Sequence, residues 1–166
     1  MIDNIKDQLK RDEGFRAKPY YCSEGKLTIG IGRCLDTNPL TQAEANYLTG
    51  QKGITPATAT EIIHAKGISE EQALWLLEAE VEHIIGALLN HYGWMRELDD
   101  ARFGVCVNMS YQLGMRGFRK FKHFLKALEG GLFAAAGAEM LNSRWARQTE
   151  ARANRLYKQM MTGRWV

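Results

Sequence analysis

Cysteines are scarce in this sequence, and their number and spacing exclude a scaffold built on disulfides. The 166 residues include only Cys22, Cys34 and Cys106. An odd number without framework spacing favours synthesis in a reducing compartment. No Cys-x-x-Cys pair or cysteine–histidine cluster occurs, and none of the four histidines has a partner at ligand spacing. We therefore expect no metal and no cofactor.

Long apolar runs are also missing. No stretch approaches the roughly 18 unbroken apolar residues that a membrane span requires. The first seven residues are polar and amphipathic, without the positive start and apolar core of a signal peptide. We expect a protein made in the cytoplasm without stable membrane insertion. With 45% hydrophobic residues and no repeat or low-complexity linker, the chain suits a single domain with a real core.

The small net charge of +3 hides an uneven distribution. Residues 116–166 hold 11 lysines and arginines against three acidic residues, a net of +8, which leaves −5 for residues 1–115. A field of this kind raises the local concentration of a polyanionic target. Bacterial envelopes, nucleic acids and acidic membranes all qualify, so charge alone does not choose among them.

The first helix and the segment after it are the most informative part of the chain. Apolar Ile2, Ile5 and Leu9 recur at helical spacing, and Gly14 is a stop signal. Glu13 is therefore expected on the last helical turn, where the helix dipole disfavours a negative charge.

A hairpin is predicted directly after this helix. Residues 23–26, Ser-Glu-Gly-Lys, are typical of a turn, and Leu27–Gly32 alternates strand-forming side chains with glycines. Glycine at every second strand position usually marks the close approach of a ligand or another backbone. The segment can thus present a carboxyl from Glu13, a thiol from Cys22 and a hydroxyl from Thr28.

These residues carry a resemblance. Glu13, eight residues, Cys22, five residues and Thr28, followed by Ile-Gly-Ile-Gly, resemble the catalytic signature of the phage-type lysozymes, glycoside hydrolase family 24. That family has Glu, then Asp or less often Cys, then Thr at this spacing. The resemblance extends to Asn-Met-x-Tyr-Gln-x-Gly at 108–114 and to residues 143–155, and it is loosest at about residues 36–67 and 115–140.

The resemblance implies roles for nine residues. Glu13 would donate a proton to the leaving oxygen, Cys22 would stand where Asp is commoner, and Thr28 would hold the attacking water, which implies inversion at the sugar carbon. Arg152 would meet Glu13 across an active cleft. Sugar and peptide groups would be bound by Asn108, Tyr111, Gln112, Arg144, Gln148 and Arg152.

Two departures from the family pattern affect the chemistry. A free thiol has a pKa of about 8.5 and needs a nearby cation to ionise appreciably at neutral pH. Cys22 could therefore orient or deprotonate water, or attack the sugar itself. Arg33 stands where the family often has His, so an ion pair formed there would not titrate in the same pH range. Trp145 is expected in the core rather than at the substrate.

Helices are predicted for most of the remaining chain. Capping boxes at Thr41/Glu44 and Ser69/Gln72 mark two helix starts, and the second of these helices should run to about Leu89. Further helices are expected at Thr58–Ala65, Asp99–Leu113, Phe118–Leu128, Leu132–Asn142 and Ala151–Met161, and Arg33–Pro39 is expected to be a loop.

The fold class predicted from these elements is α+β, with a short antiparallel sheet. We expect one lysozyme-like domain with a mixed lobe at about 12–67, a connecting helix at 68–90 and a helical lobe at 91–166, on which helix 1–11 packs. In the resembling family the active cleft lies between the lobes.

The functional hypothesis is an endolysin that hydrolyses the β-1,4 bond between N-acetylmuramic acid and N-acetylglucosamine in peptidoglycan. By resemblance it would be a monomer that stays in the host cytoplasm until a holin-type partner gives it access to the periplasm. One alternative is a lytic transglycosylase, which needs an acid/base Glu and no water. Another is a non-enzymatic module whose basic half binds nucleic acid or anionic lipid. Phe118, Phe121 and Phe124 at helical spacing favour a core stripe over such a surface, so we expect no nucleic acid partner.

Overall fold

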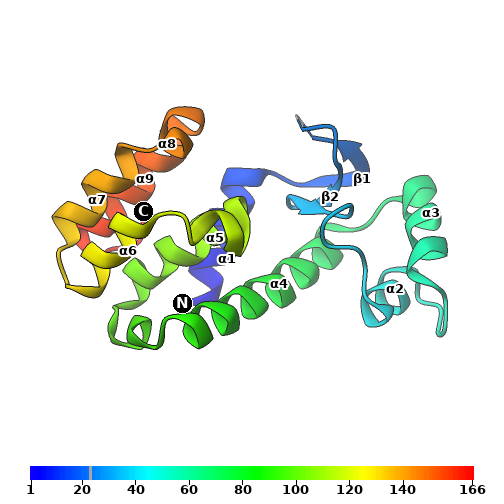
Figure 1. Ribbon diagram of the computed structural model, residues 1–166. Coiled ribbons are helices and arrows are strands. Elements are labelled where there is room, and N and C mark those ends of the chain that lie inside the picture. The colour runs from blue at the N-terminus through cyan, green and yellow to red at the C-terminus, as the bar shows by residue number, and fades with distance from the viewer. Residues whose placement is uncertain (23) are drawn as a thin grey trace. The chain divides into compact units, whose positions relative to one another are not determined.

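The computed structural model describes residues 1–22 and 24–166 and is mostly helical, with one small antiparallel sheet near the N-terminus (Figure 1). This confirms the α+β class. The elements in chain order are α1 (Ile2–Glu13), β1 (Arg16–Tyr21), β2 (Leu27–Gly30), β3 (Arg33–Cys34), α2 (Gln42–Thr49), α3 (Pro56–Lys66), α4 (Glu70–His91), the 3-10 helix η1 (Gly93–Glu97), α5 (Asp100–Phe118), α6 (Lys122–Glu129), α7 (Phe133–Leu141), α8 (Arg144–Gln148) and α9 (Glu150–Thr162).

The chain divides into two compact units, residues 6–80 and residues 1–5 with 81–166, which we call the N-terminal and C-terminal units. The N-terminal unit contains the sheet and buries Leu9, Ile29, Ile63 and Leu76. The C-terminal unit is helical, and α6, α7 and α9 pack against one another in it (Figure 1, yellow to red). Each unit therefore has apolar side chains of its own to hold it together.

The sheet has the strand order β1-β2-β3, with both pairs antiparallel. The β1–β2 turn is closed by hydrogen bonds from the Cys22 amide to the Lys26 carbonyl, 3.0 Å, and from the Gly25 amide to the Cys22 carbonyl, 2.8 Å. The predicted turn at 23–26 is thus confirmed where it is described, and Ser23 lies outside the described residues.

Strand β2 is shorter than predicted. It ends at Gly30 because Gly30 and Gly32 have φ of +64° and +73°, left-handed values that break the extended backbone and turn the chain into β3. The expected loop after Gly32 therefore begins as a third strand, in which Cys34 pairs with Thr28. Two residues of strand are too short to carry a pattern in the sequence.

Both predicted capping boxes are present. The Thr41 hydroxyl accepts from the Glu44 amide at 3.2 Å, and the Glu44 carboxylate accepts from the Thr41 amide at 2.7 Å. Ser69 and Gln72 make the equivalent pair at 3.1 and 3.0 Å, and α4 starts at the next residue after Ser69. These reciprocal bonds satisfy amide groups that a helix start leaves without partners.

The predicted helix Phe118–Leu128 is wrong in its first turn. Helix α5 continues across a break at Gly114, φ 67° and ψ 160°, and ends with Phe118, so α6 starts only at Lys122. Phe118 and Phe124 are buried and meet edge to face at 6.1 Å between ring centroids, and Phe121 contacts Phe124 from the intervening turn. The aromatic core is confirmed, but a helix–turn–helix builds it rather than one helical stripe.

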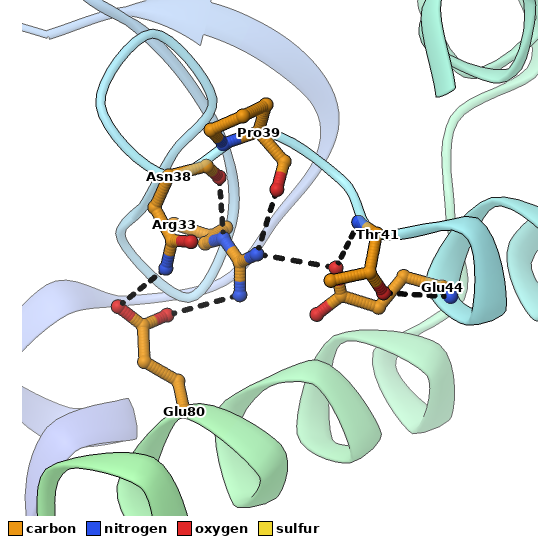
Figure 2. A network of polar contacts seen from close by, with 6 residues as sticks. All are labelled: Arg33, Asn38, Pro39, Thr41, Glu44 and Glu80. Carbon is orange, nitrogen blue, oxygen red and sulfur yellow. Dashed lines mark hydrogen bonds and ion pairs between the residues drawn. The ribbon is translucent and has the colours of Figure 1, made fainter. Parts of the chain in front are cut away.

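A buried network around Arg33 joins β3, α2 and α4 within the N-terminal unit (Figure 2). The guanidinium donates to Glu44 at 3.2 Å, to Glu80 at 3.4 Å and to the Asn38 carbonyl at 2.9 Å. Arg33 and Glu44 are only 5% and 6% exposed. Burial raises the pKa of Glu80, and the Arg33 charge opposes this rise. The ion pairs that Arg33 forms are thus local to the N-terminal unit.

Candidate active site

Glu13 is the last residue of α1, as predicted, and Gly14 follows it with a left-handed φ of 72°. Its side chain lies directly over Gly32. A methyl group built on Gly32 would stand 3.0 Å from Cγ of Glu13 and 3.1 Å from its Oε2. Glycine is needed at this point both for its backbone angle and for the space it leaves, so the turn between β2 and β3 positions the carboxyl.

Cys22 and Thr28 are brought together by the β1–β2 hairpin. Cys22 is half-buried, and it follows β1 directly, while Thr28 lies on the paired strand β2. The pKa of the Cys22 thiol is lowered, first by the Lys26 backbone amide, then by that of Glu24 and by Thr28. Thr28 is 4% exposed and also donates to the Lys26 carbonyl at 3.1 Å. Backbone amides therefore favour the thiolate here, where the sequence suggested only that a cation could do so.

Tyr20, on β1, is a further residue of this region that was not identified from the sequence. It pairs with Thr28 in the β1–β2 register, and the Arg16 guanidinium stands 4.3 Å from its ring centroid. Burial raises the pKa of Tyr20, Arg16 opposes the rise, and the charges of Glu13 and Cys22 add to it. Its phenol therefore stays protonated and can donate a hydrogen bond. The only feature of the sequence that could have indicated Tyr20 was its position between Glu13 and Cys22.

The position of Gly32 gives a first prediction. We expect Gly32→Ala to lower glycosidase activity about a hundredfold, because the methyl group displaces the Glu13 carboxyl and reacting groups tolerate little misplacement. Gly50→Ala is the matched control: Gly50, at the end of α2, has nearly the same φ, +69°, but no atom within 4 Å of the added methyl group.

Both glycine variants should lose about 1–3 kcal/mol of stability from backbone strain. Activity assays at a temperature where both proteins remain folded separate the two effects. Equal loss of activity in the two variants would contradict a positioning role for Gly32.

Asn108 and Arg152 meet in the C-terminal unit although 44 residues separate them in sequence. Arg152 Nε donates to Asn108 Oδ1 at 2.8 Å, and Nη2 reaches the Asn108 carbonyl at 3.4 Å. Asn108 is fully buried on α5, and Arg152 lies 7% exposed on the first turn of α9. The amide thus fixes the orientation of the guanidinium plane.

Gln112 is exposed on α5, and its Oε1 accepts from the Trp145 indole N–H at 2.7 Å. Trp145 itself is 5% exposed, so its placement in the core is confirmed. Tyr111 is half-buried beside Gln112 on α5. Because Asn108, Tyr111 and Gln112 are three and four residues apart, they share one face of that helix.

Arg144 and Gln148 are both exposed and stand at the two ends of α8. The helix is started by Ser143, whose hydroxyl accepts from the Ala146 amide at 3.0 Å. A separation of four residues places both side chains on the same side of this short helix. Both side chains are thus accessible to solvent from that side of α8.

Within residues 1–22 and 24–166, no group of three or more His, Cys, Asp or Glu side chains could hold a metal ion. Of the helices in this described part, none combines the length and hydrophobicity needed to cross a membrane.

Comparison with known proteins places the chain in a family. Residues 10–160 match the phage lysozyme family. The chain is 32% identical to probable T4-type lysozyme 2 of Dictyostelium discoideum and 30% identical to probable T4-type lysozyme 1, with 98% of this chain and 96% of each relative covered. It is also 30% identical to the pre-baseplate central spike protein Gp5 of Enterobacteria phage T4, of which the match spans 28%. Because the match covers nearly the whole chain, this protein belongs to the phage lysozyme family and is a glycoside hydrolase.

Proposed function

We propose that this enzyme is an endolysin that hydrolyses the β-1,4 bond between N-acetylmuramic acid and N-acetylglucosamine in peptidoglycan. What supports the proposal is that Glu13 lies against the turn after β2, and that Thr28 and Cys22 belong to the hairpin that β2 forms with β1, in a chain of the phage lysozyme family. Hydrolysis of a glycosidic bond needs a proton donor and a second group that acts on water or on the sugar carbon. These residues include both kinds.

Glu13 is the proton donor in this mechanism. Its carboxyl gives a proton to the glycosidic oxygen as the bond breaks, and the leaving sugar departs as a neutral alcohol. The absence of a side chain at Gly32 leaves the space in which this carboxyl lies against the turn after β2.

Cys22 and Thr28 act together on the water. The Thr28 hydroxyl holds the water beside the Cys22 sulfur, and the thiolate, favoured by the hairpin amides, accepts a proton as the oxygen attacks the sugar carbon. The attack comes from the face opposite the leaving group, so the product is inverted.

The C-terminal unit supplies substrate-binding groups in this proposal. The amide of Gln112 and the guanidinium of Arg144 suit sugar hydroxyls, acetamido oxygens and peptide carboxylates, and the phenol of Tyr111 offers an apolar face to a sugar ring. Gln148 lies on the same side of α8 as Arg144 and would extend this contact. Arg152, oriented by Asn108, provides a fixed cation.

The biological role in this proposal is lysis of a bacterial host at the end of phage growth. The enzyme would act as a monomer on the cell wall after a holin-type partner opens the inner membrane, and its basic residues 116–166 would draw it to the anionic envelope. Clearing of permeabilised Gram-negative cells, followed as turbidity, tests this role directly.

The products distinguish hydrolysis from transglycosylation. Purified peptidoglycan digested with the enzyme should yield muropeptides with reducing N-acetylmuramic acid ends, heavier by one water than the anhydro products of a lytic transglycosylase. Mass spectrometry of the digest makes the measurement. Anhydro ends would overturn the hydrolytic mechanism.

The stereochemistry of the first product tests the role of water. We expect proton NMR of a fresh digest to show the inverted anomer before mutarotation equilibrates it. A retained anomer would instead assign Cys22 as a covalent nucleophile.

Substitution of Cys22 tests its contribution. Cys22→Ser should remove most activity, because a hydroxyl does not ionise near neutral pH, whereas Cys22→Asp should keep activity by restoring a negative group. Cys34→Ser, on β3, is the matched control and should change little. Circular dichroism should show the fold intact in all three variants. An equally active Ser variant would show that the thiol is incidental.

A further inference from the structure

A surface pocket of about 320 Å³ lies within the C-terminal unit, where α5 ends and α6 begins. We call it the α6 pocket, and it is lined chiefly by Tyr92, Trp94, Arg119, Lys122, Lys126 and Glu129. None of these residues belongs to the candidate active site. Two aromatic rings and three cations against one carboxylate make its lining unlike an ordinary solvated surface.

The three cations of the α6 pocket come from the start of α6 and the turn before it. Lys122, Lys126 and Glu129 recur at four and three residues along α6, so they point to the same side, and Arg119 joins them from just after α5. Two lysines one turn apart repel each other. Within the described part of the chain, Arg119, Lys122 and Lys126 form no ion pair with an acidic side chain. An anion bound among them would relieve this repulsion.

The aromatic wall of the pocket is held in place from inside the core. Tyr92 and Trp94 are half-buried, with ring centroids 6.0 Å apart. Tyr92 also meets the buried Phe118 edge to face at 6.5 Å, and its amide donates to the Leu88 carbonyl at 2.8 Å. Rings fixed in this way offer a flat apolar face at little entropic cost on binding.

We propose that the α6 pocket binds a phosphate ester whose sugar or glycerol body lies against Tyr92 and Trp94 while Arg119, Lys122 and Lys126 hold the phosphate. Arginine and lysine are the side chains that pair best with phosphate oxygens. The ring of Trp94 and the side chain of Leu125 suit the less polar part of such a ligand. Glu129 lies at the edge of the pocket and disfavours a second phosphate.

Phosphate esters of this kind occur as soluble sugar phosphates and as phospholipid headgroups, and the experiment separates the two. One arm titrates the protein with glucose 6-phosphate, with glucose and inorganic phosphate as partial probes, and follows backbone amide and indole signals by NMR. The other arm measures sedimentation with phosphatidylcholine vesicles that contain or lack phosphatidylglycerol. Circular dichroism of every variant checks folding.

We expect glucose 6-phosphate to shift the signals of Trp94, Arg119 and Lys126 more than either partial probe does. Arg119→Gln/Lys126→Gln should weaken this binding about tenfold or more, because two charge-assisted contacts are lost. Lys158→Gln/Arg164→Gln removes the same charge from exposed positions that do not line the pocket and should leave binding unchanged.

If only vesicles with phosphatidylglycerol bind, and the pocket variant loses that binding, the ligand is a lipid headgroup and the proposal stands. Absence of binding in both arms overturns it. Equal losses in the pocket and control variants also overturn it, since they would show general charge attraction. Binding is measured without turnover, so failure here leaves the proposed hydrolysis untouched.

Discussion

Glu13→Gln should lower the rate of peptidoglycan hydrolysis by about a hundredfold to ten-thousandfold, the usual contribution of a general acid. The amide keeps the size of the side chain over Gly32 but has no proton to give to the leaving oxygen. The loss should fall on kcat, since proton transfer happens only in the transition state. Release of reducing ends from purified peptidoglycan at saturating substrate makes the measurement.

Glu61→Gln is the matched control for this experiment, because Glu61 is exposed on α3 and takes no part in the candidate site. It should retain full activity. Thermal unfolding of both variants should stay close to that of the unaltered enzyme. A Glu13→Gln enzyme with most of its activity left would remove the proton donor from the proposed mechanism.

Arg33→Met should destabilise the N-terminal unit by about 3–5 kcal/mol, because it leaves the buried Glu44 and the partly buried Glu80 without their cation. Methionine fills a space similar to that of arginine, so the lost stability reflects the removed charge rather than a cavity. Urea unfolding gives the free energy. Lys26→Met breaks an exposed ion pair with Glu24, 2.8 Å long, and should change stability little.

The cost of Arg33→Met should depend on pH in a definite direction. Burial already raises the pKa of Glu80 above its unfolded value, and removal of Arg33 removes what opposes that rise. A carboxyl with a raised folded pKa contributes its stability below the unfolded pKa and loses it as the pH rises through the folded pKa. The deficit should therefore be smallest in acid and grow toward neutral pH.

Neutralising the second partner provides the control. Arg33→Met/Glu80→Gln should recover part of the lost stability at neutral pH, because one unpaired buried charge is gone. A deficit that is the same at every pH, or that the second substitution does not reduce, would mean that the Arg33 network stabilises through packing alone.

Local patterns in the sequence predicted the parts of the fold that local chemistry determines. The two capping boxes lie within three residues of each helix start, and Gly14 ends α1 where its backbone angle requires a glycine. Family resemblance added the roles of Glu13, Cys22 and Thr28, and the hairpin that joins the last two is itself a local structure.

Features that depend on contacts distant in sequence could not be predicted. The presence of Arg33 where the family often has histidine indicated that an ion pair there would not titrate in the pH range of histidine. It did not indicate that the partners of Arg33 would be Glu44 and Glu80. The same holds for the 44-residue separation of Asn108 and Arg152. The glycine alternation signalled a close approach at Gly32, without showing that the approaching group is the Glu13 side chain.

The half-buried thiol of Cys22 makes this enzyme open to chemistry that a carboxylate at the same place would not undergo. A cysteine whose pKa is lowered reacts readily with peroxides and alkylating agents, whereas burial raises the pKa of Cys106 and protects it. Hydrolytic activity that depends on this thiol would then fall in an oxidising medium, and a reductant would restore it after mild oxidation.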